Sequence, residues 1–189
     1  MELPKLQKID LNKPKKKKIL LLADDFRLPS GIGTISKEII YNTVHHYDWV
    51  QIAGAIKHPE AGKVVDLSQA TKDMVKIPDA YVKLYPTDGY GNDQVLFSIM
   101  QIEKPDAIMH FTDPRFWGWL YAIEKQVRAK VPLTYLHIWD DLPYPMWNRP
   151  FYQSCDALFA ISKQSNNIAK HVLGAENCFS LDEVENQTV

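Results

Sequence analysis

The stretch Lys18-Ile-Leu-Leu-Leu-Ala-Asp24 decides the fold, together with the loop Asp25-Phe-Arg-Leu-Pro-Ser30 and the segment Gly31-Ile-Gly-Thr that follow it. An aliphatic run between charged residues predicts a buried strand, and the segment from Gly31 to Ile40 predicts a helix opened by glycine. Helix N-termini present unpaired N–H groups and a partial positive charge, and glycine lets an anion approach the backbone. This corner is therefore a candidate site for a nucleotide or a sugar diphosphate.

The motif in this loop matches neither of the two standard phosphate-binding patterns. It contains Gly-x-Gly, but Ser36 stands where the dinucleotide fingerprint has its third glycine, and no Gly-Lys-Ser/Thr of a P-loop follows. A tight turn before a helix explains the same residues without any ligand.

Composition indicates a globular protein large enough for one sizeable core. The chain has 189 residues, of which 46% are hydrophobic and 24% charged, and its net charge of -1 gives no bulk attraction to nucleic acid. Cys155 and Cys178 lie in no metal-binding or redox spacing, which favours a reduced, cytoplasmic setting. The N-terminus lacks an apolar signal region, and the longest aliphatic run, Ile19–Ala23, is too short to cross a bilayer.

The basic run Lys13-Pro-Lys-Lys-Lys-Lys18 stands directly before the first predicted strand. It is typical of a solvated tail, and peripheral contact with an anionic membrane surface is the alternative. We expect three regions: a basic flexible tail over 1–17, a Rossmann-like domain over 18–174, and an interdomain-like or frayed segment over 175–189.

Strands and helices are expected to alternate along the central region. The expected strands are Lys18–Asp24, Trp49–Ile56, Val82–Tyr85, Ala107–Phe111, Leu133–Ile138 and Asp156–Ile161, and the main expected helices are Gly31–Ile40, Asp93–Glu103, Thr112–Arg128 and Ser162–Leu173. Crossovers of this length predict a doubly wound parallel sheet with helices on both faces. Ligands of such sheets bind at the carboxyl ends of the strands.

Polar and aromatic residues gather where the strand Leu133–Ile138 ends. His137 is followed by Asp140 and Asp141, and Trp139 lies between His137 and these two aspartates. Carboxylates and imidazoles bind hydroxyls, and aromatic rings cover the apolar faces of pyranoses, so the mixture suits a sugar site. A core histidine and an Asx turn are the structural alternatives, and for Asp113, which precedes Pro114, the alternative is a helix cap.

The order of three features resembles the N-terminal half of GT-B glycosyltransferases, and glycosyltransferase family 4 most closely. They are the glycine loop after the first strand, the strand Thr134-Tyr-Leu-His137 with Asp140, and the segment Ala157-Leu-Phe-Ala-Ile-Ser-Lys-Gln-Ser-Asn-Asn-Ile-Ala-Lys-His-Val-Leu-Gly174. The resemblance runs from about Lys18 to Gly174. It implies an enzyme that transfers a sugar from a nucleotide-sugar donor to a glycan or lipid-linked acceptor, with no metal or other cofactor bound by the protein.

The resemblance also implies roles for individual residues. His137 lies beside the transferred sugar as the catalytic residue. The loop at the donor diphosphate comprises Ser30, Gly31 and Gly33, and the acceptor contacts are Arg27, Asp113, Arg115, Trp139, Asp140 and Asp141.

Enzymes of this family hold most of the donor site, with a Glu-x7-Glu pair, in a second Rossmann-like domain. The sequence contains no such domain, so we expect a partner domain in cis or in trans and an inactive chain without it.

Three other classes remain as alternatives. A non-catalytic carbohydrate- or nucleotide-binding module would use the same surface. A metal-dependent hydrolase would draw on His110, Asp113, His137 and Asp140 as ligands. A phosphoacceptor receiver domain is disfavoured, because Asp66 lies in a polar stretch and no Lys-Pro pair follows the fifth strand.

Overall fold

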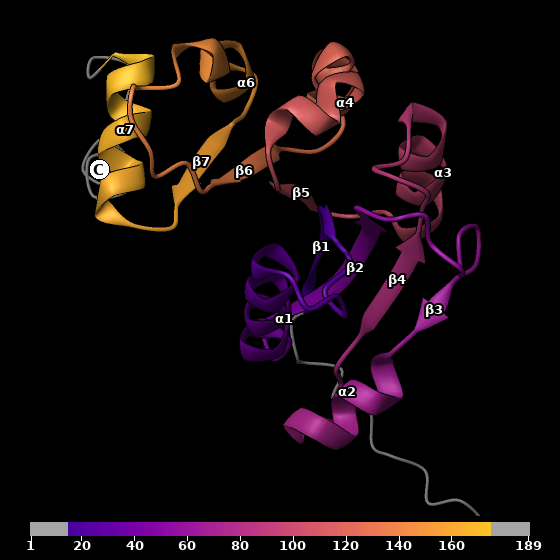
Figure 1. Ribbon diagram of the computed structural model, residues 1–189. Coiled ribbons are helices and arrows are strands. Elements are labelled where there is room, and N and C mark those ends of the chain that lie inside the picture. Colours follow the sequence, from indigo (N-terminus) through magenta and orange to yellow (C-terminus); the bar gives the residue numbers. More distant parts are fainter. Residues whose placement is uncertain (1–14, 175–189) are drawn as a thin grey trace, which may run out of the picture.

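The structure is a computed structural model that describes residues 15–174, arranged as one sheet with helices on both faces (Figure 1). The strands are β1 (Lys17–Asp24), β2 (Tyr47–Gly54), β3 (Val65–Asp66), β4 (Val82–Pro86), β5 (Ala107–Phe111), β6 (Leu133–His137) and β7 (Ala157–Ala160). The α-helices are α1 (Gly31–Thr43), α2 (Ser68–Val75), α3 (Asp93–Glu103), α4 (Gly118–Ala122), α5 (Glu124–Arg128), α6 (Arg149–Gln153) and α7 (Lys163–Leu173), and the two 3-10 turns are η1 (Pro114–Trp117) and η2 (Met146–Asn148).

The strand order is β3-β4-β2-β1-β5-β6-β7. All neighbouring strands are parallel except β3, which pairs antiparallel with β4. This arrangement confirms the predicted Rossmann-like α/β fold. The chain moves outward from β1 to β2 and β4, then returns through α3 to β5 on the other side of β1, so the direction of winding reverses between β1 and β5.

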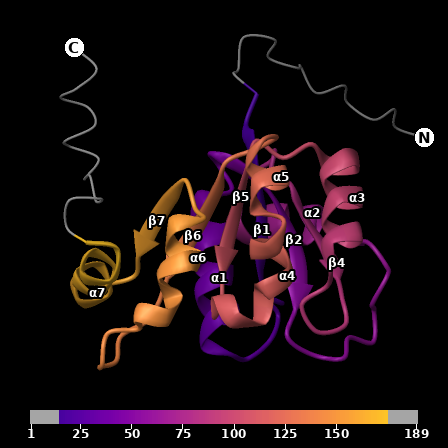
Figure 2. The same ribbon diagram turned by 90° about the horizontal axis from the view of Figure 1, so that it is seen from above.

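The central strand β1 is buried on both faces, and each face has its own hydrophobic core. Leu20 and Leu22 contribute to the core under α3, α4 and α5, whereas Leu21 and Ala23 contribute to the core under α1. Figure 1 shows α1 on one side of the sheet and α3 and α4 on the other, and Figure 2 views the face covered by α3, α4, α5 and α6. Two-sided burial explains why β1 is an unbroken aliphatic run rather than an alternating pattern.

The structure corrects the single helix predicted over Thr112–Arg128. This segment forms η1, α4 and α5, and the chain leaves helical geometry at Ile123 (φ -111, ψ 12). Gly118 and several aromatic residues give the segment low helix propensity, so the packing of Trp117, which is fully buried, decides its path. The second strand also begins two residues earlier than predicted and ends at Gly54, before the positive φ of Ala55.

The prediction of a solvated basic tail over residues 1–17 is wrong for the lysines next to β1. Lys16 donates to the backbone oxygens of Val44 (2.8 Å) and Asp79 (3.0 Å), and Lys18 pairs with Glu103 at 2.7 Å. Lys17 already belongs to β1. These residues fasten the start of the sheet, while residues 1–14 of the predicted tail and the predicted segment 175–189 lie outside the described residues.

Glu103 is a buried carboxylate at the end of α3 that gathers several donors. Its oxygens accept from Lys18 Nζ (2.7 Å), Tyr81 Oη (2.9 Å) and Tyr85 Oη (2.7 Å). Burial opposes the charge, but the hydrogen bonds from Lys18 and the two tyrosines outweigh it and lower the pKa of Glu103 below its ordinary 4.5. The network ties β1, β4 and α3 together at the amino end of the sheet.

We expect Glu103→Gln to lower the free energy of unfolding by about 2 kcal/mol, because it leaves the partly buried Lys18 ammonium without its counter-ion. The pKa of Glu103 is lower in the folded chain, so its contribution is complete above the unfolded pKa and disappears as pH falls through the folded value. Urea denaturation between pH 7 and pH 3 measures both effects. The control is Glu38→Gln on the exposed side of α1, and an equal loss in the two variants would contradict the assignment.

Candidate functional site

The candidate site lies where the winding reverses, at the carboxyl ends of β1, β5 and β6. The strand arrowheads in Figure 2 point to this edge of the sheet. Three connections border it: the β1–α1 loop, the β5–η1 turn and the β6–η2 loop. In open α/β sheets this crevice is the usual place for a ligand.

The β1–α1 loop is tightly closed on itself. Ser30 is the N-cap of α1, and its Oγ accepts from the backbone N–H of Gly33 at 2.9 Å. A Cβ atom on Gly33 would lie 2.6 Å from the backbone oxygen of Leu28, so this glycine is required by the packing of the loop itself. A Cβ on Gly31 would have no atom within 4 Å, which leaves the first turn of α1 open at that residue. The residues of the predicted diphosphate loop, Ser30, Gly31 and Gly33, therefore do lie at a helix N-terminus. The presence of Gly33 does not by itself indicate a ligand, because the packing of the loop already requires a glycine there.

Asp24 lies at the end of β1, next to the point where the winding reverses. Its carboxylate is within 3.3 Å of Ser30 Oγ and 3.4 Å of both Tyr90 Oη and Thr112 Oγ1. These contacts are long, and the Thr112 hydroxyl also lies against the backbone oxygen of Phe111. Within residues 15–174 no cation lies within ion-pair distance of Asp24. The carboxylate can thus accept further hydrogen bonds from a ligand.

Asp24 was not among the predicted contact residues, although its position at a strand end was visible in the sequence. Its partners Thr112 and Tyr90 were not predicted as site residues either. Tyr90 reaches the site from the β4–α3 connection, 66 positions along the chain, and no local pattern indicates that contact.

Arg27 is engaged within the protein. Its guanidinium binds both oxygens of Asp25, and the same group pairs with Glu60 at 2.9 Å. His58 accepts at Nδ1 from the N–H of Glu60, so its Nε2–H is oriented to donate to Asp25 at 3.0 Å. Burial opposes the charge of Asp25, but Arg27 lowers its pKa below 3.8. Arg27 was predicted as an acceptor contact, but its charge is met by Asp25 and Glu60, and these pairs fasten the β2–β3 connection to the end of β1.

Asp113, Arg115 and Trp139 come together across the ends of β5 and β6. Asp113 accepts from the N–H of Arg115 at 2.9 Å and pairs with its guanidinium, which lies 5.8 Å from the centre of the Trp139 ring. The N-cap alternative for Asp113 is thus confirmed. The structure nevertheless brings three predicted acceptor contacts into one cluster at the rim of the crevice.

Asp140 and Asp141 lie in the exposed β6–η2 loop. The backbone oxygen of Asp141 accepts from Trp139 Nε1 at 2.9 Å, and that of Asp140 accepts from Gln164 at 2.6 Å. Asp141 also accepts at its carboxylate from the N–H of Leu142. Backbone contacts therefore shape this loop and leave the Asp140 carboxylate facing solvent.

Exposed aromatic rings lie in η1 and η2, the turns that follow β5 and β6. Phe116 is 58% exposed and stacks on Tyr90, with ring centres 5.3 Å apart. Trp147 is 51% exposed and lies edge-on to Trp139 at 5.7 Å. Large apolar rings next to a carboxylate and hydroxyls give a surface with both hydrogen-bonding and stacking capacity.

His137 lies beneath this surface, with its side chain 0% exposed. Its Nδ1 is 3.0 Å from Tyr152 Oη, and burial lowers its pKa to about 4. His110 is buried in the same way: its Nδ1 is 2.9 Å from Tyr121 Oη, and burial lowers its pKa to about 3. Both are core histidines in this structure, which confirms the structural alternative for His137, and each has a tyrosine hydroxyl next to its Nδ1.

Within residues 15–174 the structure does not bring the four ligands of the hydrolase alternative together as a metal site. Among residues 15–174 no group of three or more His, Cys, Asp or Glu side chains is placed to hold a metal ion. The two histidines of that hypothesis are buried against tyrosines, and Asp113 is paired with Arg115.

Comparisons with protein-family models, with curated proteins and with solved structures gave no match. In the part of the chain that the structure describes, no helix is both long and apolar enough to span a bilayer.

The two loop glycines give a matched pair of substitutions. Gly33→Ala should lower the free energy of unfolding by about 1–3 kcal/mol, because its Cβ would collide with the Leu28 oxygen. Gly31→Ala should leave it unchanged or raise it by up to about 1 kcal/mol, because the site is open and alanine favours helix. Thermal and urea unfolding measure both, and equal effects would contradict the described packing.

A pH titration should detect the low pKa values of the two buried histidines. His137 and His110 have folded pKa values below the ordinary 6.5, so their contribution to stability is complete above pH 6.5 and is lost as pH falls toward about 4. Imidazole NMR signals should show both rings neutral at pH 6. A ring of His137 that titrates near 6.5 would show that it is solvated in solution.

Proposed function

We propose that this chain is the acceptor-binding domain of a glycosyltransferase of the GT-B type. In this proposal it works with a second Rossmann-like domain, in cis or in trans, that binds most of the nucleotide-sugar donor. The observation that carries the proposal is the carboxylate of Asp24, which has no cationic partner among the described residues and lies within 3.4 Å of the hydroxyls of Tyr90 and Thr112, with exposed Phe116 stacked on Tyr90.

The chemistry of the crevice suits a carbohydrate. A sugar hydroxyl donates well to a carboxylate with spare acceptor capacity, which Asp24 has. The apolar face of a pyranose packs on an aromatic ring, and Phe116, Trp139 and Trp147 provide such rings at the rim. A phosphate would meet the negative charge of Asp24 directly, so we assign this central position to the acceptor.

The remaining predicted residues take supporting places in this proposal. The open first turn of α1 at Gly31 faces the donor diphosphate, where its N–H groups favour an anion. Arg115 and Asp113 act as a pair at the acceptor rim. Arg27 acts through Asp25 and Glu60 by holding the loop in place.

His137 enters the proposal as a positioning residue. Its buried ring and its contact with Tyr152 connect the end of β6 to α6, below the loop that carries Trp139. Its burial is also the observation that favours the second candidate, a carbohydrate-binding module without catalysis. The two candidates share the binding surface and differ in whether turnover appears when a donor domain is supplied.

Binding to an array of immobilised neutral oligosaccharides tests both candidates. The chain should be retained by pyranose-containing glycans, and Asp24→Asn and Trp147→Ala should each weaken retention about tenfold or more through a lost charge-assisted hydrogen bond and a lost stacking surface. Ile102→Ala is the control, because this residue is 68% exposed on α3, away from the crevice.

Retention that survives both substitutions, or no retention by any glycan, would overturn the assigned surface. Retention with sugar transfer from UDP-glucose or GDP-mannose, after addition of a donor domain, would separate the enzyme from the binding module.

A further inference from the structure

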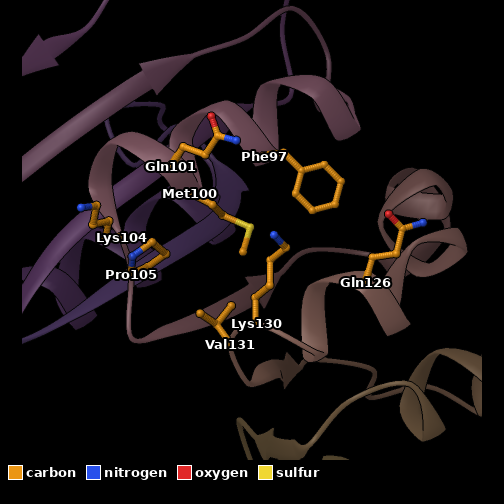
Figure 3. A pocket seen from close by; sticks show the side chains of 8 residues that line it. All are labelled: Phe97, Met100, Gln101, Lys104, Pro105, Gln126, Lys130 and Val131. Carbon is orange, nitrogen blue, oxygen red and sulfur yellow. The ribbon is translucent and has the colours of Figure 1, made fainter.

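A groove lies at the opposite edge of the sheet from the candidate site, between α3 and α5 (Figure 3). This α3–α5 groove has a volume of about 490 Å³ and is lined by Phe97, Met100, Gln101, Lys104, Gln126 and Lys130, among others. Lys104 directly follows α3 and Lys130 lies two residues beyond α5, so the groove opens at the amino ends of β5 and β6. It is separate from the candidate glycan site and does not depend on the proposed function.

The walls of the groove combine apolar and amide groups. Met100 forms part of the floor and Phe97 one wall, and both belong to the apolar packing of α3 against the sheet. Figure 3 shows the Lys130 side chain directed toward Met100 and Phe97, and its Nζ lies 5.9 Å from the centre of the Phe97 ring. Gln126 lies on the other side of the groove.

The two lysines of the groove differ from their neighbours in having no counter-ion. At this edge of the sheet Lys16, Lys17 and Lys18 pair with carboxylates. Among the described residues, neither Lys104 nor Lys130 forms an ion pair, and no Asp or Glu lines the groove.

Helix dipoles do not cancel this charge. The C-terminal ends of α3 and α5 each contribute at most about half a negative charge, against one full positive charge on each lysine. The groove therefore keeps a net positive potential over an apolar floor, which favours a ligand that is anionic at one end and apolar at the other.

We propose that the α3–α5 groove binds a single anionic amphiphile. Its phosphate or carboxylate head lies at Lys130 within reach of the Gln101 and Gln126 amides, and its alkyl chain packs on Met100 and Phe97. The concave shape and small volume suit one molecule rather than the surface of a bilayer.

Methyl NMR locates this binding directly, because the chain has only five methionines. With n-octyl phosphate as the probe, the Met100 methyl signal should shift in a saturable way, while that of Met74, which is exposed on α2, should not. Inorganic phosphate tests the head alone, 1-octanol tests the chain alone, and phosphatidylcholine vesicles with and without phosphatidylglycerol test a membrane source.

The variant Lys130→Met should weaken octyl phosphate binding about tenfold or more, as expected for a lost contact between a cation and an anion. Lys125→Met removes an exposed charge from α5 outside the groove and is the matched control. Equal effects of the two variants would overturn the proposal.

The experiments with the other probes also have definite outcomes. Binding of inorganic phosphate as tight as that of octyl phosphate would reduce the groove to an ion site. Equal binding of octanol would remove the role of the charge, and binding to anionic vesicles without a Met100 shift from the soluble probe would assign the lysines to a membrane surface. Each of these results contradicts a single bound amphiphile.

Discussion

Burial of β1 on both faces is the constraint on which the rest of this structure depends. Its aliphatic residues enter two cores at once, so helices must cover both sides of the sheet. Right-handed crossovers then carry the chain outward on each side of β1, and the winding reverses beside it. The candidate site at the end of β1 follows from this arrangement, because ligands of such sheets bind at the point of reversal.

Several charged groups hold the fold together: Glu103 joins β1, β4 and α3, and Asp25 with Arg27 fastens a long connection to the end of β1. Asp24 and the lysine pair Lys104 and Lys130 differ, because no opposite charge among the described residues lies within ion-pair distance of them. Unpaired charges beside a hollow or a crevice are where a ligand can contribute the missing partner.

The histidines show how burial changes the meaning of a motif. In the sequence His137 stands at a strand end followed by two aspartates, as a catalytic residue would. In the structure its ring points into the core beneath α6, and Tyr152 occupies one of its nitrogens. The same reading applies to Arg27, whose charge is met by Asp25 and Glu60. The type of residue at a strand end is therefore weaker evidence of a binding site than a polar atom at that end that has no strong partner within the protein.

Much of the architecture followed from the sequence alone. The aliphatic run of β1, the limits of α3 and β5, and the start of α7 at Ser162 depend on local periodicity and capping, which neighbouring residues specify. Only the tertiary structure decided which face of β6 carries His137, how η1, α4 and α5 divide one predicted helix, and that Tyr90 and Thr112 meet Asp24. Those features arise from contacts between residues far apart in the chain, and the burial that produces them has no local signature.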